Sequence, residues 1–325
     1  MSPVGRSTGL SDPGRKRRRN EDAWVCDPPL FAIADGMGGA RAGEIASRLA
    51  AAALGADVDS SGEERLVGLI QEANRRVYER AAEDSTTSGM GTTITVALVE
   101  DGSVRIGHVG DSRAYLIRDR SLDQLTDDHS LVAELVRSGR LSPEEAESHP
   151  QRSVITRAIG TDPDVDVDTF SVEARPGDLF LLCSDGLTDM VGDEEILQTV
   201  EEKRDNLEAA AAELVGKANR NGGEDNITVV FFEIVEEGAE PPADTKPMAA
   251  VDEQPTEVDE DTLSGLDSPP AVDTMVVPPE QVREMAAPPE VPRERFGVQV
   301  ARVLVALAII AALGLLVYWL LGQSQ

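Results

Sequence analysis

Residues 30–39 read Leu-Phe-Ala-Ile-Ala-Asp-Gly-Met-Gly-Gly, an apolar run that ends in Asp35 and a group of glycines. The apolar run predicts a buried strand, and the glycines predict a sharp turn directly after it. A carboxylate at the end of a buried strand is costly unless a cation lies beside it. Asp35 is therefore a candidate metal ligand.

Three further aspartates stand beside apolar runs. Asp111 follows the run 104–110, Asp185 follows the run 178–184, and Asp225 lies just before the run 227–232. Each one alone is compatible with a helix cap or a turn. Four together at strand ends predict one carboxylate cluster for divalent cations. Oxygen ligands favour Mg²⁺ or Mn²⁺.

The chain has 325 residues, and its character changes along its length. Residues 1–235 carry strand and helix patterns that suit one folded domain. Residues 236–302 open with a stretch rich in proline and acidic residues, which predicts a disordered linker leading to a juxtamembrane segment. Residues 303–321 are uncharged and long enough for a transmembrane helix, and residues 322–325 are a short tail beyond it.

The distribution of charge bears on partners and location. Residues 1–235 hold 25 Lys and Arg against 44 Asp and Glu, which argues against nucleic acid as a partner. Arg293, Arg295 and Arg302 precede the predicted span, and no Lys or Arg follows it. We therefore expect a single-pass protein of the cell membrane whose large N-terminal domain is cytoplasmic. Cys26 and Cys183 lie in apolar runs and are predicted to be reduced core residues.

The element patterns predict an α+β domain with layered antiparallel sheets, not a βαβ nucleotide-binding fold. Residues 1–13 are expected to form a loose arm, Gly110-Asp111 a hairpin turn, and residues 127–152 a lobe over the site. The predicted helices cover 41–54, 63–83, 193–202 and 206–219. The predicted strands lie near 23–26, 92–99, 103–109, 113–118, 122–125, 154–158, 165–172 and 227–234.

Two other patterns carry less weight. The alternation Asp164-Val165-Asp166-Val167-Asp168 would suit a phosphoaspartate phosphatase or a nucleotide-sugar transferase, but its period of two instead predicts aspartates on the solvent-exposed face of an edge strand. The three histidines are scattered, so a zinc site is not expected.

Six short motifs follow one another along the chain. They are Arg17-x-x-Asn20-Glu21-Asp22, Asp35-Gly36-Met37-Gly38-Gly39, Gly91-Thr92-Thr93, Gly110-Asp111-Ser112-Arg113-Ala114-Tyr115, Ser184-Asp185-Gly186-Leu187 and Glu224-Asp225-Asn226-Ile227-Thr228. In this order they resemble the motifs of the metal-dependent protein Ser/Thr phosphatases, the PPM family of type 2C. The resemblance covers about residues 5–235, and Met37 together with the predicted tail is similar to a bacterial membrane-anchored branch.

The resemblance implies a sandwich of two antiparallel β-sheets flanked by helix pairs, with two Mn²⁺ or Mg²⁺ ions at one end. Asp35 would bridge the ions, and the carbonyl of Gly36 would face one of them. Arg17 would bind the substrate phosphate. The other implied ligands are Asp22, Asp185 and Asp225, with Glu21 direct or through water. A third ion of some members would use Asp111 and Asp185, with Ser153 as a further candidate.

The implied function is hydrolysis of phosphoserine and phosphothreonine by water activated between metal ions, with no covalent phosphoenzyme. Met37 stands where some members carry a histidine assigned as general acid, so that step has no assigned residue here. The implied partners are phosphorylated proteins, in particular membrane Ser/Thr kinases, met by a monomeric catalytic domain.

Two alternatives remain open at this point. One is a catalytically weak scaffold that binds phosphoproteins, although the full set of aspartates argues against it. The other is a phosphatase of anti-sigma-type regulators. The linker threonines Thr256 and Thr262 are candidate phosphorylation sites, but a plain spacer is the simpler interpretation.

Overall fold

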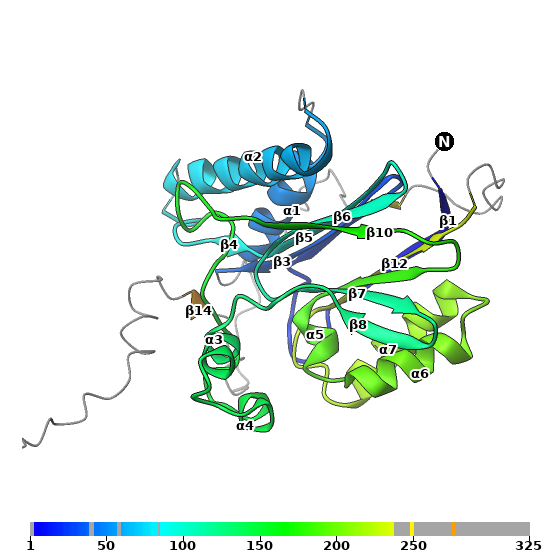
Figure 1. Cartoon of the computed structure of the whole chain (residues 1–325). Coiled ribbons are helices and arrows are strands. Elements are labelled where there is room, and N and C mark those ends of the chain that lie inside the picture. The colour runs from blue at the N-terminus through cyan, green and yellow to red at the C-terminus, as the bar shows by residue number, and fades with distance from the viewer. Residues whose placement is uncertain are drawn as a thin grey trace, which may run out of the picture. The chain divides into compact units, whose positions relative to one another are not determined.

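The structure is a computed structural model of the whole chain. It describes residues 3–38, 42–56, 60–83, 85–236, 248–249 and 275–276. Two antiparallel sheets face each other in these residues, and helices cover both outer faces (Figure 1). The predicted α+β sandwich of two antiparallel sheets flanked by helix pairs is confirmed.

The strands of the described residues divide into two main sheets. One has the order β1-β12-β11-β7-β8, and the other has the order β10-β6-β5-β3-β2-β13, with β4 added to β3. The first comprises β1 (Val4–Asp12), β12 (Ile227–Ile234), β11 (Leu179–Cys183), β7 (Arg113–Arg118) and β8 (Ser121–Gln124). The second comprises β10 (Asp168–Glu173), β6 (Ser103–Val109), β5 (Ile94–Glu100), β3 (Leu30–Met37), β2 (Asp22–Asp27), β13 (Met248–Ala249) and β4 (Gly91–Thr92).

The inner faces of the two sheets form an aromatic core. Phe232 of β12 stacks between Phe31 of β3 and Phe180 of β11, with ring centroids 4.2 and 4.9 Å apart. All three side chains are fully buried. Stacked rings remove large apolar areas from water, so this core holds the two sheets in register with each other.

Helices cover the outer faces in two pairs. Helices α1 (Ala42–Ala53) and α2 (Gly62–Glu83) cover the sheet of β3, and α6 (Asp193–Glu202) and α7 (Leu207–Arg220) cover the sheet of β12 (Figure 1). The buried stripe of α1 is made mainly of alanines, which let the helix lie close to the strands. A short helix, α5 (Asp185–Thr188), follows β11 directly.

Residues 127–158 form a lobe beside the sandwich, and its helices are seen at the lower left of Figure 1. It contains α3 (Leu131–Arg137), α4 (Pro143–Glu147) and the short strand β9 (Val154–Ile155). Ser142 and Glu145 form a capping box at the start of α4. The lobe has a small hydrophobic core of its own. In a separate cluster, Met37 at the end of β3 packs against Ile155 and Ala158 of the lobe.

Several sequence-based predictions of local structure were wrong. Residues 4–12 are a strand, β1, paired along β12, and not part of a loose arm. Gly110-Asp111 joins β6 of one sheet to β7 of the other, so it is a crossover and not a hairpin turn. The strand near 154–158 is limited to Val154–Ile155.

The acidic alternation 164–168 is also not a strand until its last residue, because β10 begins at Asp168. Its aspartates are nevertheless exposed, and Val165 is buried against α2 and the sheet, as the period of two predicts. β10 is the edge strand of its sheet, also as predicted.

The C-terminal predictions concern residues that the structure describes only in part. Two strands, β13 and β14 (Met275–Val276), fall within residues 236–302, and β14 pairs with β9. No helix among the described residues is long and apolar enough to cross a membrane. The predicted span 303–321 and the tail 322–325 lie outside the described residues.

Candidate metal centre

Two of the predicted ligands are direct neighbours across a pair of strands. Asp22 is the first residue of β2, and its register partner on β3 is Asp35. The backbone of Asp35 is fixed by Thr93, whose hydroxyl accepts a hydrogen bond from the Asp35 N–H at 3.0 Å. Thr93 N–H in turn donates to the Asp35 carbonyl at 2.8 Å. Opposed strand positions therefore bring two carboxylates together.

The other sheet supplies hydroxyl groups that orient Asp22. Ser184, at the end of β11, donates to Asp22 Oδ2 at 3.0 Å, and Thr228 of β12 donates to the same oxygen. One oxygen of Asp22 is thus held from across the sandwich. Its other oxygen, Oδ1, is buried and has no hydrogen-bond partner in the described residues.

The other predicted ligands come from the turns at the same end of the sandwich. Asp185 opens α5 directly after β11, and Asp225 lies just before β12. Gly186 lies so close to Asn226 that a Cβ on it would be 2.0 Å from the Asn226 carbonyl oxygen. Only glycine allows this approach, which brings the segments carrying Asp185 and Asp225 side by side.

Arg17 lies at the edge of the cluster. Its Nη2 donates to Asp225 Oδ2 at 2.7 Å, and the charges of Asp35 and Glu21 also act on its guanidinium. Asn226 holds the loop that carries Arg17, because its side chain donates to the carbonyls of Pro13 and Arg19 at 3.0 and 2.9 Å. The phosphate-binding candidate is therefore fixed beside the metal ligands.

The surroundings of these carboxylates disfavour their ionised form and raise their pKa values. Burial, with the charge of Asp225 as a further cause, raises the pKa of Asp22 to about 7. Burial and the charges of Asp22 and Asp185 raise the pKa of Asp35 well above its usual range. Burial and the charges of Asp111 and Asp225 do the same to Asp185. Each carboxylate disfavours ionisation of the others. A divalent cation would relieve the repulsion within the cluster, since it supplies the positive charge that the buried carboxylates lack.

The donor set fits Mn²⁺ or Mg²⁺. Asp22, Asp111 and Asp185 each have a buried Oδ1 without a hydrogen-bond partner in the described residues, which leaves lone pairs for an ion. Among the described residues, no three His, Cys, Asp or Glu side chains are arranged around one common point where an ion could bind. Mg²⁺ usually takes one or two carboxylates and completes its shell with water, so pairs within this cluster suffice.

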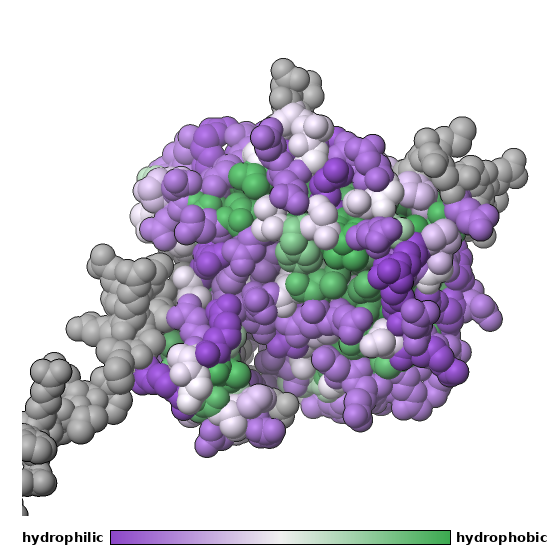
Figure 2. Space-filling model, viewed as in Figure 1, coloured by the Kyte–Doolittle hydropathy of each residue, from purple (hydrophilic) through white to green (hydrophobic). Residues whose placement is uncertain are grey.

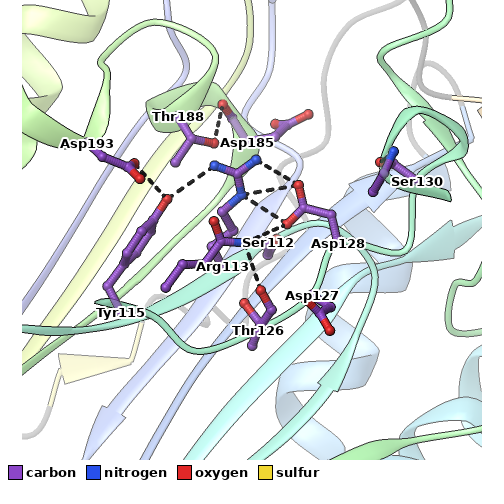
Figure 3. A network of polar contacts seen from close by, with 12 residues as sticks. Ser112, Arg113, Tyr115, Thr126, Asp127, Asp128, Ser130, Asp185, Thr188 and Asp193 are labelled. Carbon is purple, nitrogen blue, oxygen red and sulfur yellow. Dashed lines mark hydrogen bonds and ion pairs between the residues drawn. The ribbon is translucent and has the colours of Figure 1, made fainter. Parts of the chain in front are cut away.

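Asp111 lies on the crossover between the sheets, buried to 8% exposure. Burial, with the charges of Asp128 and Asp189, raises its pKa to about 7. The guanidinium of Arg113 binds Asp128 through Nε and Nη2 at 2.9 and 2.7 Å (Figure 3). Asp111 acts electrostatically on both Asp35 and Asp185, so it belongs to the same cluster.

Three other predicted residues lie near the cluster in different ways. Gly36 packs against the start of α1, where a Cβ would be 2.1 Å from the Gly43 carbonyl oxygen, and its N–H donates to the Glu21 carbonyl. The Glu21 side chain lies close to Gly43. Ser153 lies in the lobe and lines the same groove as Asp111 and Asp185.

The Met37 side chain packs in an apolar cluster and has no proton to donate as a general acid. Its side chain is buried at 5% exposure in the apolar contact with Ile155 and Ala158. The residue after Asp35-Gly36 therefore joins the catalytic strand to the lobe.

Sequence reasoning missed several supporting residues. Asn226 and Ser184 stand in the quoted motifs, but their structural roles were not predicted. Asp189 follows Asp185 by four residues, one helical turn later, and its charge acts on Asp185 and Asp111. That spacing was the available signal. Nothing local in the sequence marks His129, whose contacts are with residues distant in the chain.

Comparison with known proteins identifies the family. The family model for protein phosphatase 2C matches residues 15–217. The chain belongs to the protein phosphatase 2C family. Serine/threonine phosphatase stp of Listeria monocytogenes is 42% identical to it over 236 residues, covering 69% of this chain and 93% of the relative.

Solved structures agree with the family assignment. The Mycobacterium tuberculosis serine/threonine phosphatase PstP/Ppp matches with a TM-score of 0.68 and 42% identity, covering 71% of this chain and 99% of that one. The catalytic domain of PstP in complex with two manganese ions matches with a TM-score of 0.66 and 40% identity, covering 72% and 99%. This phosphatase 2C chain is a metal-dependent protein Ser/Thr phosphatase, and its cofactor is Mn²⁺ or Mg²⁺.

The carboxylate cluster of this phosphatase is suited to that chemistry. Divalent ions held there would lower the pKa of water and neutralise charge on a phosphoryl group. A guanidinium such as that of Arg17 can pair with phosphate oxygens by charge-assisted hydrogen bonds. Ser184 and Thr228 keep Asp22 in one orientation, and Thr93 does the same for the backbone of Asp35, so the ligands need little rearrangement.

Proposed function

We propose that this chain dephosphorylates serine and threonine side chains of proteins at the inner face of the cell membrane and opposes membrane Ser/Thr kinases. The observation that carries the catalytic part is the group of aspartates with raised pKa values beside Arg17. Asp35 would bridge two ions, and Asp22, Asp185 and Asp225 would complete their ligand sets. Asp111 supports a third ion beside Asp185.

The membrane part of the proposal is supported by sequence alone. The uncharged run 303–321 would rise about 28 Å as a helix, close to the roughly 30 Å hydrocarbon core of a bilayer. Arg293, Arg295 and Arg302 lie just before the run, which favours a cytoplasmic catalytic domain. A tether of this kind would raise the effective concentration of the enzyme toward kinases in the same membrane.

The catalytic proposal is tested with the full chain and a Ser/Thr kinase domain phosphorylated on its own threonines. Release of phosphate with Mn²⁺, and its loss with a chelator, is the expected result. Tight binding of the phosphorylated kinase without any metal-dependent release would favour a scaffold instead.

The membrane proposal needs a separate experiment. The full chain should stay in the membrane fraction after an alkaline carbonate wash. The double substitution Ile309→Lys and Ile310→Lys should release it, because charges at the centre of a span are costly. A wild-type chain that is removed by the wash would contradict the anchoring.

A further inference from the structure

A groove of about 1050 Å³ runs between the lobe and the sandwich and ends at the metal centre. We call it the lobe groove; α3 and α4 line one side, the segment 188–193 lines the other, and Asp111 and Asp185 close its inner end. Asp111 Oδ1, on a side chain that is more than nine-tenths buried, lies there without a hydrogen-bond partner in the described residues. Figure 2 shows the lobe set off from the main body by a hollow.

The lobe side of the groove is partly apolar. Val132, Ala133 and Val136 of α3 line it and stay partly exposed, whereas Leu131 packs into the core of the lobe. Met190 lies on the opposite side. A phosphate group needs no apolar wall and far less space, so the groove is built for something larger than the reacting group.

Two of the three arginines that line the groove are neutralised by its own carboxylates. Arg113 binds Asp128 at 2.7 Å in an ion pair that is mostly shielded from solvent. Arg152 lies 3.5 Å from Asp189 and 3.3 Å from Glu224, in longer and more exposed pairs. The third, Arg137 at the end of α3, is exposed, so its charge counts against the negative charge of the groove.

The net charge of the side chains that line the groove is negative. Apart from the metal ligands Asp111 and Asp185, five carboxylates and three arginines line the groove. Asp127 and Asp193 are exposed, and Asp193 accepts a hydrogen bond only from a neutral group, the hydroxyl of Tyr115, among the described residues. Figure 3 shows the Asp127 carboxylate directed away from Arg113 and Asp128. The groove therefore attracts a positive charge.

We propose that the lobe groove binds the polypeptide of a phosphoprotein substrate next to the phosphorylated residue and selects a lysine or arginine there. The proposal rests on the phosphatase function proposed above. Apolar side chains of the substrate would contact Val132, Val136 and Met190, and its basic side chain would lie beside Asp127 or Asp193. The same charge argues against the acidic stretch 236–292 as the occupant, since like charges repel.

The test uses the full chain with Mn²⁺ and a set of alanine-based phosphothreonine peptides. A lysine or a glutamate is moved one position at a time along the peptide, and kcat/KM is measured for each. At one or more positions we expect the lysine peptide to be better by about fivefold, because a partly exposed ion pair is worth no more than that. Equal rates for the two peptides at every position would overturn the proposal.

Charge-reversal variants show which carboxylates of the groove produce the preference for lysine. Asp127→Lys should reverse it in favour of glutamate, a gain that a folding defect does not produce. Asp123→Lys, on exposed β8 outside the groove, is the matched control and should keep the lysine preference. A preference that is unchanged in both Asp127→Lys and Asp193→Lys would place the recognition elsewhere and overturn the proposal.

A small ester separates this proposal from the catalytic one. p-Nitrophenyl phosphate reaches the metal centre without filling the groove, so its turnover reports the ions and Arg17 alone. If the wild-type chain hydrolyses this ester but shows no charge preference among peptides, the groove proposal fails and the phosphatase function stands. If neither substrate is hydrolysed, the phosphatase function fails, and the groove proposal fails with it. Lysine peptides that inhibit only by making the chain self-associate would show the groove to be an interface between copies.

Discussion

His129 holds the backbone of Gly110 at both ends. The Gly110 N–H donates to His129 Nδ1 at 3.0 Å, and the His129 N–H donates to the Gly110 carbonyl at 2.7 Å. Gly110 has φ of +118° and directly precedes Asp111, so this pair of contacts fixes the turn that places the carboxylate. Asp168 of β10 lies 3.1 Å from His129 Nε2, which fixes the other side of the ring.

We expect His129→Leu to lower stability by about 1–3 kcal/mol, because a buried N–H of Gly110 would lose its acceptor. It should also raise the Mn²⁺ concentration needed for half-maximal activity, because Asp111 would no longer be positioned. His129→Asn keeps an acceptor near the Nδ1 position and should restore much of the metal response. Denaturant titration and Mn²⁺ titration of activity measure the two effects.

A purely structural role for His129 makes a different prediction. In that case both variants would lose stability without any change in the Mn²⁺ response. If the effect runs through Asp111, adding His129→Leu to Asp111→Asn should raise the Mn²⁺ requirement no further.

Asp35→Asn should abolish most activity and leave the fold intact. We expect kcat to fall by orders of magnitude, since Asp35 is the proposed bridge between ions. The metal-free variant should be more stable than the wild type at neutral pH, because one of several repelling carboxylates is gone. Thermal unfolding in chelator and turnover of p-nitrophenyl phosphate check both. Near-normal turnover would remove Asp35 from the mechanism.

Metal and pH should act on stability through the same carboxylates. The pKa of Asp22 and of Asp111 is about 7 in the fold, against 3.8 for an ordinary aspartate. The folded state therefore binds more protons than the unfolded state between about pH 4 and 7. This contribution is fully present below pH 3.8 and is lost as pH rises through 7.

Mn²⁺ should consequently raise the Tm most above pH 7, where the carboxylates are ionised, and less as pH falls toward 5. The comparison is between Tm values with Mn²⁺ and with chelator across this range. His108 and His129 oppose the trend in both forms, since burial lowers their pKa to about 4 and the fold loses stability as pH falls from 6.5 toward 4. The difference between metal-bound and metal-free forms cancels that shared term. A shift that does not depend on pH would contradict the carboxylate explanation.

The fold and the site could be predicted to different depths. The candidate ligand aspartates could be proposed from the sequence because each stands beside an apolar run, and an apolar run is a local signal. Strand β1 was missed because it has no such run: Gly5 and Gly9 lie within it, and a Cβ on Gly9 would be 2.4 Å from the ring of Trp24. The need for glycine at position 9 becomes clear only from Trp24, which lies on another strand, β2.

The crossover at Gly110 was missed for a related reason. A glycine and an aspartate between two apolar runs are typical of a hairpin turn, and nothing local tells which sheet each run joins. The sheet that each strand joins is decided by backbone pairs such as Leu182 with Ala114, which are far apart in the chain. The same limit applies to His129, whose partners Gly110 and Asp168 are distant in sequence.

Arg17→Ala should chiefly raise KM for a phosphopeptide, by about tenfold, because a charge-assisted contact with the phosphate is lost. Arg18→Ala is a matched control, since Arg18 is the exposed neighbour in the same loop. An unchanged KM in Arg17→Ala would assign the phosphate contact to another residue. Arg17 also binds Asp225 at 2.7 Å, so the variant should alter Mn²⁺ affinity as well, and KM is therefore compared at saturating Mn²⁺.

Met37→Ala tests whether the lobe is fixed by the strand that carries Asp35. Removing this buried side chain should destabilise the protein by about 2–5 kcal/mol, the usual range for such truncations. Because Met37 contacts Ile155 and Ala158, the loss should also loosen the lobe relative to the metal centre. Peptide kcat/KM should then fall more than turnover of p-nitrophenyl phosphate, since only the peptide would use the lobe groove. Equal losses for both substrates would show that Met37 acts on the metal centre itself and not through the lobe.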